Sequence, residues 1–445
     1  MYTRIVNLLT ILLFPCFSCA FPLSMIEYAE QIMYFLRCIV MKTAGLITEY
    51  NPFTRGHALH LEEARLKTGA DFCIAAMSGD FVQRGEPALF SKHLRTEMAL
   101  RSGVDAVFEL PVDTASGSAE FFAAGAVFLL TALGADYLVF GSESGEIAPF
   151  LELSELLLEE PPLYREALKC GLQKGLSFPA ARMQALILLG KRELSFDPSV
   201  FLSTPNNILG VEYCKALRRI KSPLLPVTIK REGAGYHDSG LDSSRLSSAS
   251  ALRKLLLNRQ YQEVLPSQVP PCTLPVYEKA MKDGGPLTSK DFSLLLFARL
   301  LEKDTEDLTQ ILDLSPELAA RIRRLQNQFL DWPSFVSLLK TRELTQTRIQ
   351  RALLHLLLNI EEWKEPSFAR LLGFQKSSAP LLGYLKKKST LPILTKLADA
   401  SSVLSDDAAK ELALTTHASQ LYQAVFSQVY GKPFLHEYQK QVVIL

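Results

Sequence analysis

Short apolar runs alternate with amphipathic stretches between residues 43 and 231, and this alternation restricts the fold of the chain most strongly. The apolar runs have the length and composition of buried strands and lie at 43–49, 72–77, 104–110, 136–140 and 225–231. Segments with helical spacing separate them, at 57–67, 91–102, 119–133 and 211–219. This order predicts a parallel sheet covered by helices on both faces, and therefore an α/β fold.

Polar segments that contain glycine follow several of the expected strands, at 51–57, 78–86 and 141–145. The carboxyl ends of parallel strands share one edge of the sheet, and ligands bind at that edge. We therefore expect these segments to form one site.

The first of these segments, together with the last residues of the strand before it from residue 47, predicts a phosphate site. It reads as a strand end, a loop broken by Pro52 and Gly56, and the first turn of a helix. A helix N-terminus gathers free N–H groups and the positive end of the helix dipole. Thr54, His57 and His60 are the catalytic candidates there, because imidazoles can donate hydrogen bonds where phosphate charge builds up. The alternative is a polar loop that only caps a helix.

A second phosphate signal lies at Ser248, Ser250 and Arg253. Two hydroxyls at a helix start with an arginine one turn later can hold a polyphosphate tail. The alternative is an ordinary serine N-cap followed by a surface arginine.

Residues 78–87 are a candidate wall for a second substrate. Arg84 is the expected partner of a carboxylate or phosphate, with Ser78 and Lys92 as further candidates. The alternative is a structural loop in which Arg84 pairs with Glu86 at the surface.

The chain has 445 residues and a net charge of +1, so two or three domains are expected and any basic face must be local. From residue 274 onwards the pattern is Leu-rich and helical, with no strand expected. Residues 320–396 contain 14 Lys and Arg against 5 Asp and Glu, a surplus of nine positive charges. This surplus favours RNA binding over the alternative, a solvated helical face.

We predict three segments. Residues 1–40 contain an apolar run at 5–17 and are expected to be an extension outside the functional fold, an export or anchor segment being the alternative. Residues 41–265 form the α/β domain with a helical insertion at about 147–203, and 266–445 form an all-α domain. The seven cysteines are scattered, which argues against a disulfide framework or a zinc site and for a reducing compartment.

Several longer motifs resemble one family. Thr54-x-Gly-His57 with the later segment of Ser248 and Arg253 resembles the HIGH-motif nucleotidyltransferase superfamily. The longer motif Glu49-Tyr-Asn-Pro-Phe-x-x-Gly-His57 and the segments 78–87, 140–143 and 205–210 make the chain similar to the tRNA(Met) cytidine acetate ligase family from about residue 41 to the C-terminus. Thr54 stands where many members carry His, and Ala249 and Ser250 also depart from the second motif.

The resemblance implies a Rossmann-like domain in which ATP activates acetate as acetyl-adenylate. The acetyl group then passes to N4 of the wobble cytidine of elongator tRNA(Met), bound by the helical domain. The implied ATP contacts are Ile47, Thr48, Glu49, Tyr50, Asn51, Pro52, Phe53, Thr54, Arg55, Gly56, His57, Ala58, Leu59, His60, Gly141, Asn206, Asn207, Lys230 and Arg231.

Mg²⁺ is expected to accompany ATP, with no dedicated metal site in the protein. A cytoplasmic enzyme without membrane attachment is expected. Two alternatives stay open: a small-molecule adenylyl- or cytidylyltransferase, and an RNA-binding protein without turnover.

Overall fold

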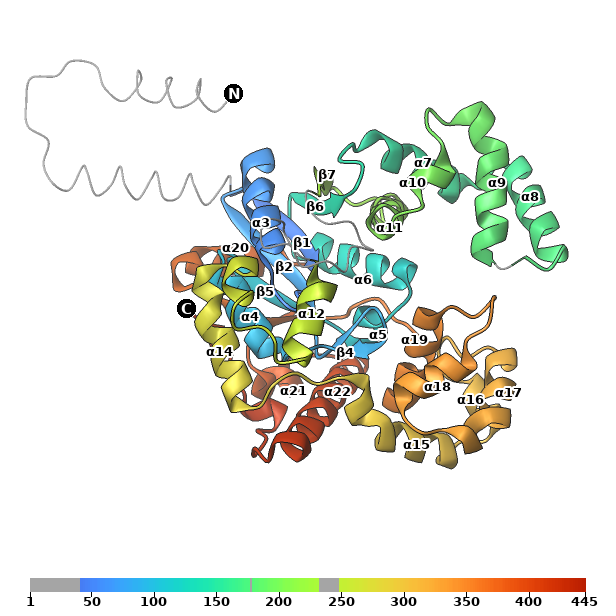
Figure 1. The fold of residues 1–445 in the computed structure, drawn as a ribbon. Coiled ribbons are helices and arrows are strands. Elements are labelled where there is room, and N and C mark those ends of the chain that lie inside the picture. Colours follow the sequence, from blue (N-terminus) through green and yellow to red (C-terminus); the bar gives the residue numbers. More distant parts are fainter. Residues whose placement is uncertain (1–40, 177, 232–247) are drawn as a thin grey trace, which may run out of the picture. The chain divides into compact units, whose positions relative to one another are not determined.

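The structure, a computed structural model, describes residues 41–176, 178–231 and 248–445 (Figure 1). The expectations for residues 1–40 lie outside the described residues. Residues 42–445 form one compact unit. The division between an α/β and a helical domain at 265/266 stays a prediction.

A mainly parallel sheet forms the centre of this unit, as the sequence predicts. Its strands follow the order β10-β8-β5-β2-β1-β6-β7, with β9 paired to β8. The five strands expected from the sequence are β1 (Thr43–Thr48), β2 (Phe72–Ser78), β5 (Ala106–Leu110), β6 (Tyr137–Ser142) and β7 (Leu225–Lys230). All four pairings among these five strands are parallel. The chain passes from β1 to β2 on one side of β1, whereas β6 lies on the other side of β1. The strand order therefore reverses between β1 and β6.

Helices cover both faces of the sheet because the strands are apolar on both sides. One face packs against α3 (Arg55–Thr68) and α4 (Lys92–Arg101), and Cys73 lies in this core. The other face packs against α6 (Ala119–Ala132) and α11 (Pro205–Arg219), and Cys214 lies in that core.

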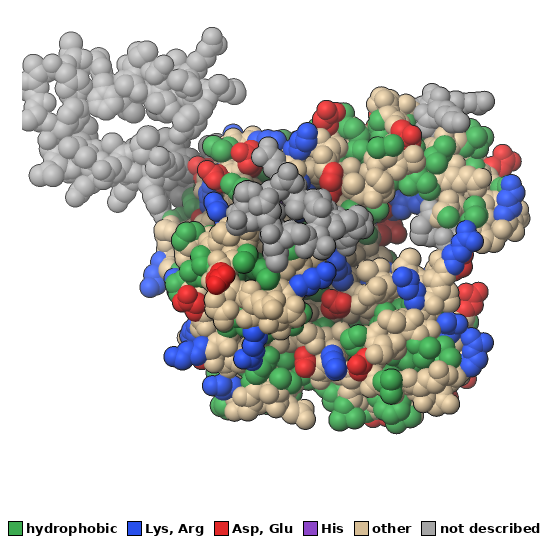
Figure 2. Space-filling view, viewed as in Figure 1, with side chains coloured by type: hydrophobic (Ala, Val, Ile, Leu, Met, Phe, Trp, Pro, Cys, Tyr) green, Lys and Arg blue, Asp and Glu red, His purple; other side chains and the backbone are tan. Residues whose placement is uncertain are grey.

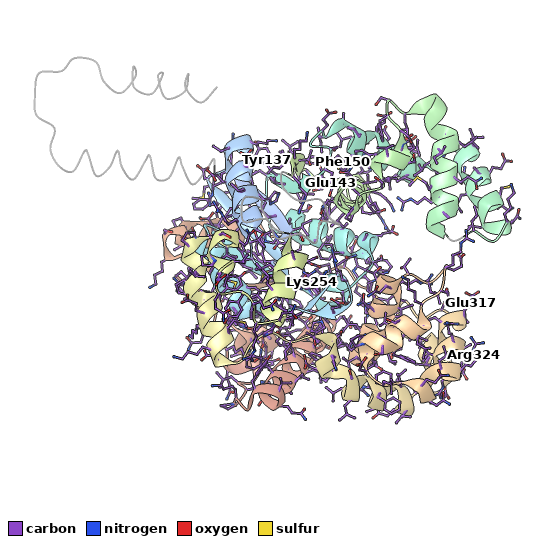
Figure 3. All side chains as sticks on the ribbon, viewed as in Figure 1. Tyr137, Glu143, Phe150, Lys254, Glu317 and Arg324 are labelled. Atoms are coloured by element: carbon purple, nitrogen blue, oxygen red, sulfur yellow. The ribbon has the colours of Figure 1, made fainter. Side chains whose placement is uncertain are left out.

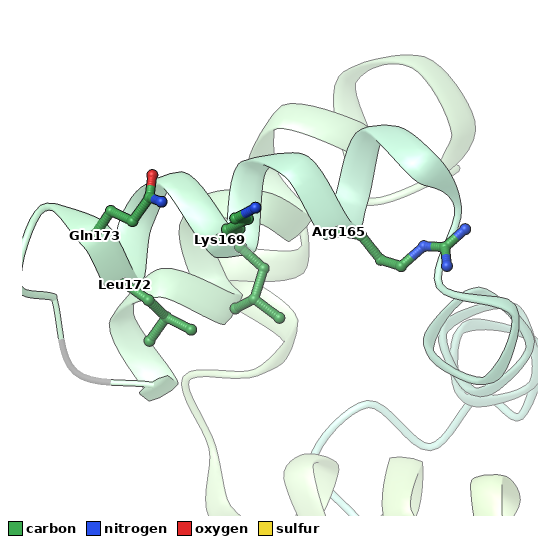
Figure 4. A pocket seen from close by; sticks show the side chains of 5 residues that line it. Arg165, Lys169, Leu172 and Gln173 are labelled. Carbon is green, nitrogen blue, oxygen red and sulfur yellow. The ribbon is translucent and has the colours of Figure 1, made fainter.

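The expected helical insertion is confirmed. It consists of α7 (Ala148–Glu159), α8 (Pro162–Gln173), α9 (Phe178–Glu193) and α10 (Pro198–Phe201). An open hollow of about 480 Å³ lies along α8, lined by Arg165, Leu168, Lys169, Leu172 and Gln173 (Figure 4). It contains none of the predicted site residues.

The C-terminal part is mainly helical, as predicted. Its helices are α12 (Ala249–Leu257), α13 (Leu265–Gln268), α14 (Leu274–Asp283), α15 (Ser293–Glu302), α16 (Thr305–Thr309), α17 (Pro316–Leu325), α18 (Trp332–Leu339), α19 (Gln346–Leu358), α20 (Ala379–Lys388), α21 (Ala400–Val403) and α22 (Asp406–Tyr430). In the part of the chain that the structure describes, no helix is long and apolar enough to cross a bilayer.

The expectation of an all-α region without strands after residue 274 is wrong at three places. Strand β8 (Ala369–Phe374) pairs antiparallel with β5, while β9 (Ile393–Leu394) and β10 (Val443–Ile444) pair with β8. Arg370 obscures the strand pattern of β8, because a buried arginine is unusual in a sheet. The structure pairs it with Glu109 at 2.8 Å and with Glu437 at 2.7 Å.

A short hairpin connects the sheet to the helical part. It consists of β3 (Phe81–Val82) and β4 (Glu86–Pro87), and Phe81 is buried in the core of the C-terminal helices. Gly85 has φ +76°, and a Cβ there would lie 2.3 Å from the backbone nitrogen of Arg351. The hairpin therefore packs directly against the backbone of α19.

We predict that Gly85→Ala lowers the free energy of unfolding by at least about 2 kcal/mol, because the methyl group meets backbone and the φ angle disfavours a side chain. Urea denaturation measures the change. Gly383→Ala is the matched control: Gly383 lies in α20 with nothing within 4 Å of a Cβ, so alanine there should stabilise by about 0.5–1 kcal/mol. Equal midpoints for the Gly85 variant and the unmodified protein would contradict this packing.

Candidate active site

Three side chains bind alternate backbone carbonyl groups of the loop between β1 and α3. Arg95 of α4 donates to the carbonyl oxygen of Glu49 at 2.6 Å. Arg253 of α12 donates to that of Asn51 at 2.6 Å, and the hydroxyl of Tyr277 of α14 donates to that of Phe53. We call this set the carbonyl clamp: Arg95, Arg253 and Tyr277.

Arg95 anchors the clamp. Its side chain is fully buried, and it also donates to the carbonyl oxygens of Ser78, Gly79 and Phe90. Burial lowers the pKa of its guanidinium, and nearby carboxylates such as Asp80 oppose this shift. Because four carbonyl groups share one rigid cation, Arg95 fixes the loops after β1 and β2 relative to each other.

Two polar side chains of the loop bind backbone instead of pointing freely into solvent. The Asn51 Oδ1 atom accepts from the backbone N–H of Leu89 at 2.8 Å, and Glu49 Oε1 accepts from that of Gln83 at 2.9 Å. The loop is therefore ordered before any ligand arrives, which reduces the entropy lost on binding.

His57 is fixed in one tautomer. Thr54 is the N-cap of α3, and its backbone N–H donates to His57 Nδ1 at 3.0 Å. A backbone N–H can only donate, so a neutral His57 carries its proton on Nε2. The pKa of His57 is lowered to about 3, first by burial and then by the charges of Arg231 and His60.

His60 lies one turn further along α3. Its Nε2 is buried and has no hydrogen-bond partner among the described residues. Its pKa is lowered to about 4 by burial and by Arg231. Both imidazoles are therefore neutral at physiological pH, and a neutral imidazole has one nitrogen that donates and one that accepts.

Arg231 and Gly141 lie next to each other at the ends of β7 and β6. The Arg231 backbone N–H donates to the carbonyl of Ser142 at 2.9 Å. A Cβ on Gly141 would lie 3.3 Å from the side chain of Arg231. Arg231 is exposed and acts electrostatically on both imidazoles. The neighbouring Lys230 is also exposed.

Asn206 and Asn207 hold the loop after β6. The Asn207 Oδ1 atom accepts from the backbone N–H of Glu143 at 3.1 Å, and Asn206 donates to Glu143 Oε1 at 2.6 Å. The other carboxylate oxygen of Glu143 is buried without a partner among the described residues. Figure 3 labels Glu143, which follows β6, and Phe150 of α7. Both asparagine side chains are thus committed to positioning this loop.

The second phosphate motif has a different geometry from the one expected. Ser248 caps α12 by accepting from the backbone N–H of Ala251 at 3.2 Å, as in the alternative interpretation. Arg253 also contacts Ser250 at 2.8 Å. Through Arg253 the two motifs are in direct contact.

The candidates of the second-substrate wall differ in accessibility. Ser78 is fully buried at the end of β2, and its hydroxyl lacks a partner in the described chain. Arg84 is half-buried on the β3–β4 hairpin.

Lys92 does not face an open site. Its side chain is fully buried, with its amino group 2.7 Å from carboxylate oxygens of both Glu109 and Glu437. Arg370 contacts the same two carboxylates. Contrary to the expectation, Lys92 is not placed to contact a substrate, because its ammonium group is buried and paired with these carboxylates.

The described residues contain no group of three or more His, Cys, Asp or Glu side chains that could hold a metal ion. The arrangement combines a helix N-terminus, two neutral imidazoles and an exposed arginine, which is suited to binding and polarising phosphates. Sequence reasoning missed Tyr277, which lies beyond the expected domain boundary and carries no motif.

We expect Tyr277→Phe to weaken ATP binding several-fold without unfolding the protein. The Phe53 carbonyl would lose its partner, at a cost of about 1–3 kcal/mol, and the loop would lose part of its order. Titration calorimetry measures the dissociation constant. Tyr430→Phe is the matched control, since its hydroxyl also donates to a backbone carbonyl, that of Pro286 at 2.7 Å. Equal affinity in both variants would argue against the clamp.

The ring signals of His57 and His60 should not titrate between pH 5 and 8, because their pKa values lie at about 3 and about 4. Both are depressed, so the stability they contribute is complete above the unfolded value of about 6.5 and declines as pH falls towards 3–4. NMR of histidine-labelled protein tests this, with His57→Ala and His60→Ala for assignment. Midpoints near 6.5 for either ring would contradict the burial of these imidazoles.

A family model and relatives with known names match most of the chain. The family described as HIGH Nucleotidyl Transferase matches residues 41–435. A tRNA(Met) cytidine acetate ligase from Acetivibrio thermocellus is 37% identical over 418 residues, which cover 91% of this chain and 100% of that protein. One from Caldanaerobacter subterraneus subsp. tengcongensis is 41% identical over 375 residues, covering 82% and 91%.

Solved structures agree as well. Thermotoga maritima TmcAL in its apo form has a TM-score of 0.86 and 32% identity, covering 91% of this chain and 100% of that one. The same protein bound with alpha-thio ATP has a TM-score of 0.84 with the same identity and coverage. The chain therefore belongs to the tRNA(Met) cytidine acetate ligase family of HIGH nucleotidyl transferases.

Proposed function

We propose that this protein uses ATP to activate acetate and then acetylates N4 of the wobble cytidine of elongator tRNA(Met). The observation that carries the first half is the clamped loop with two neutral imidazoles at a helix N-terminus. Support for the tRNA half comes from relatives of that name, which match nearly the whole chain.

The reaction has two steps. An acetate oxygen attacks the α-phosphorus of ATP, the bond to the bridging oxygen breaks, and pyrophosphate leaves. The cytidine amino group then attacks the acetyl carbon, AMP leaves with the bonding electron pair, and the nitrogen gives up one proton. Neither step needs a covalent enzyme intermediate, so positioning and charge stabilisation supply the catalysis.

The residues have separate roles in this proposal. His57 donates from Nε2 to a phosphate oxygen, with Thr54 fixing its tautomer, and His60 contributes a second imidazole. Residues 47–60, Gly141, Lys230 and Arg231 line the nucleotide site at the reversal of strand order between β1 and β6. Asn206 and Asn207 position the 143–144 backbone, and Ser248 and Arg253 support the loop from α12.

Acetate and the cytidine would approach from the side of β2, where Arg84 remains a proposed contact. Ser78 is fully buried there, so its proposed role is to support this wall from within. Lys92 is left out, since its charge is paired with buried carboxylates. Mg²⁺ is proposed to arrive with ATP, held mainly by phosphates and water, as is usual for this ion. The helical region 266–445 is the proposed tRNA-binding part.

A cytoplasmic location follows from this proposal, because ATP and tRNA are available there. A small-molecule nucleotidyltransferase or a non-catalytic RNA-binding protein is less well supported, since neither matches the names of the relatives.

Acetate-dependent ATP–pyrophosphate exchange tests the first half on purified protein. Exchange should require acetate, and His57→Ala should lower it at least about 100-fold, as for loss of a donor to a transition-state charge. His417→Ala, an exposed histidine on α22, is the control and should exchange normally. Acetyl transfer from labelled acetate to tRNA(Met) tests the second half.

Absence of acetate-dependent exchange in the unmodified protein, with or without tRNA, would sink acetate activation. Exchange without transfer to tRNA would keep the adenylation step and reject the acceptor.

A further inference from the structure

The positive charge of residues 320–396 is divided between opposite edges of the sheet. Strands β1, β2, β5 and β6 run in the same direction, so their carboxyl ends lie at one edge and their amino ends at the other. Strands of five to seven residues at about 3.3 Å per residue separate these edges by roughly 15–20 Å. Only the carboxyl edge carries the candidate active site.

The N-terminal half of α19 lies on the side of the carboxyl edge. Glu49, in the loop between β1 and α3 that we call the catalytic loop, binds the backbone of Gln83 in the β3–β4 hairpin. The hairpin in turn packs on α19, through Gly85 against the backbone of Arg351 and through Glu86 against the Gln350 side chain. Gln350 and Arg351 lie in the second turn of α19, so a short series of contacts joins this turn to the loop between β1 and α3. Arg348 and the loop before the helix are close to these contacts in sequence.

Helix α20 lies at the amino edge, because β8 runs antiparallel to β5 and delivers the chain there. The backbone N–H of Thr390 donates to the carbonyl of Ala132, which precedes β6, at 2.9 Å. Lys388 approaches Asp136 at 3.8 Å, and Asp136 also precedes β6. Lys386 and Lys387 consequently lie at the edge away from the catalytic loop.

Several basic side chains of the surplus are used inside the protein. Arg321 donates to the carbonyl oxygens of Leu338 and Leu339, and Arg351 pairs with Asp313 at 3.1 Å.

By contrast, Lys340 and Arg342 are exposed and Arg348 is half-buried, and none of the three pairs with a carboxylate in the described chain. We call these three the α19 basic group. Figure 2 shows Lys and Arg side chains on both the left and right sides of the face viewed.

We propose that the α19 basic group binds phosphates of the tRNA whose cytidine enters the active site, and that Lys386 and Lys387 do not. This inference rests on the proposed function. The modified base must reach the carboxyl edge, so the phosphates nearest to it lie on that side of the protein. Arginine forks and a lysine ammonium are the groups that hold RNA phosphates, and unpaired ones do so without first breaking an ion pair.

Two matched double variants test the proposal, Lys340→Ala with Arg342→Ala and Lys386→Ala with Lys387→Ala. Each removes two exposed cations, so net charge changes equally. Binding of tRNA(Met) is measured by fluorescence anisotropy over a series of salt concentrations. The first variant should lower the slope of log K against log salt by between one and two and raise the KM for tRNA. The second should leave the slope and that KM unchanged.

Acetate-dependent exchange in both variants shows that the fold and the adenylation site are intact. If exchange is normal, equal salt slopes in the two variants would overturn this inference without touching the proposed function. A larger loss of slope in the variant with Lys386→Ala and Lys387→Ala would do the same. Failure of the unmodified protein to bind tRNA would contradict the inference and the acceptor together. Loss of exchange in the unmodified protein would instead count against acetate activation.

Discussion

The binding of three backbone carbonyls of the loop between β1 and α3 by Arg95, Arg253 and Tyr277 is the interaction on which the candidate site depends. A loop between a strand and a helix has many accessible conformations, and ordering it on ligand binding would reduce affinity. Here α4, α12 and α14 hold it from outside, so the helix N-terminus and both imidazoles are already in place. The partners come from residues 95 to 277, and the loop therefore requires most of the fold to be assembled around it.

A second constraint is a buried group of charges beside β5 and the start of α4. Lys92, Arg370, Glu109 and Glu437 form a buried cluster with two charges of each sign. Burial alone would raise the pKa of Glu437, but Lys92 and Arg370 hold it well below its usual range. Loss of one member would leave a buried charge without its partner, which costs about 3–5 kcal/mol. The cluster joins the C-terminal residues to β5 and to the start of α4.

Antiparallel β8 has a consequence for recognition of a large substrate. By bringing the chain back to the amino edge it places α20 far from the catalytic loop, while α19 stays near it. The local charge surplus is thus a sum over two surfaces at opposite edges of the sheet. Any account of tRNA binding that uses net charge alone would count both.

The sequence by itself determined the parallel sheet, the position of the candidate site in the loop between β1 and α3, and the family, because these depend on local periodicity and on motifs of neighbouring residues. Thr54, Gly56, His57 and His60 were recognisable as a site without knowledge of any partner. Only the tertiary structure decided the roles of Lys92, Arg253, Tyr277 and Arg370. Each of these side chains interacts with residues that are distant in sequence, and in all four cases those contacts determine whether the charge or hydroxyl faces a ligand or the protein itself. Such pairings arise from packing, which no local pattern encodes.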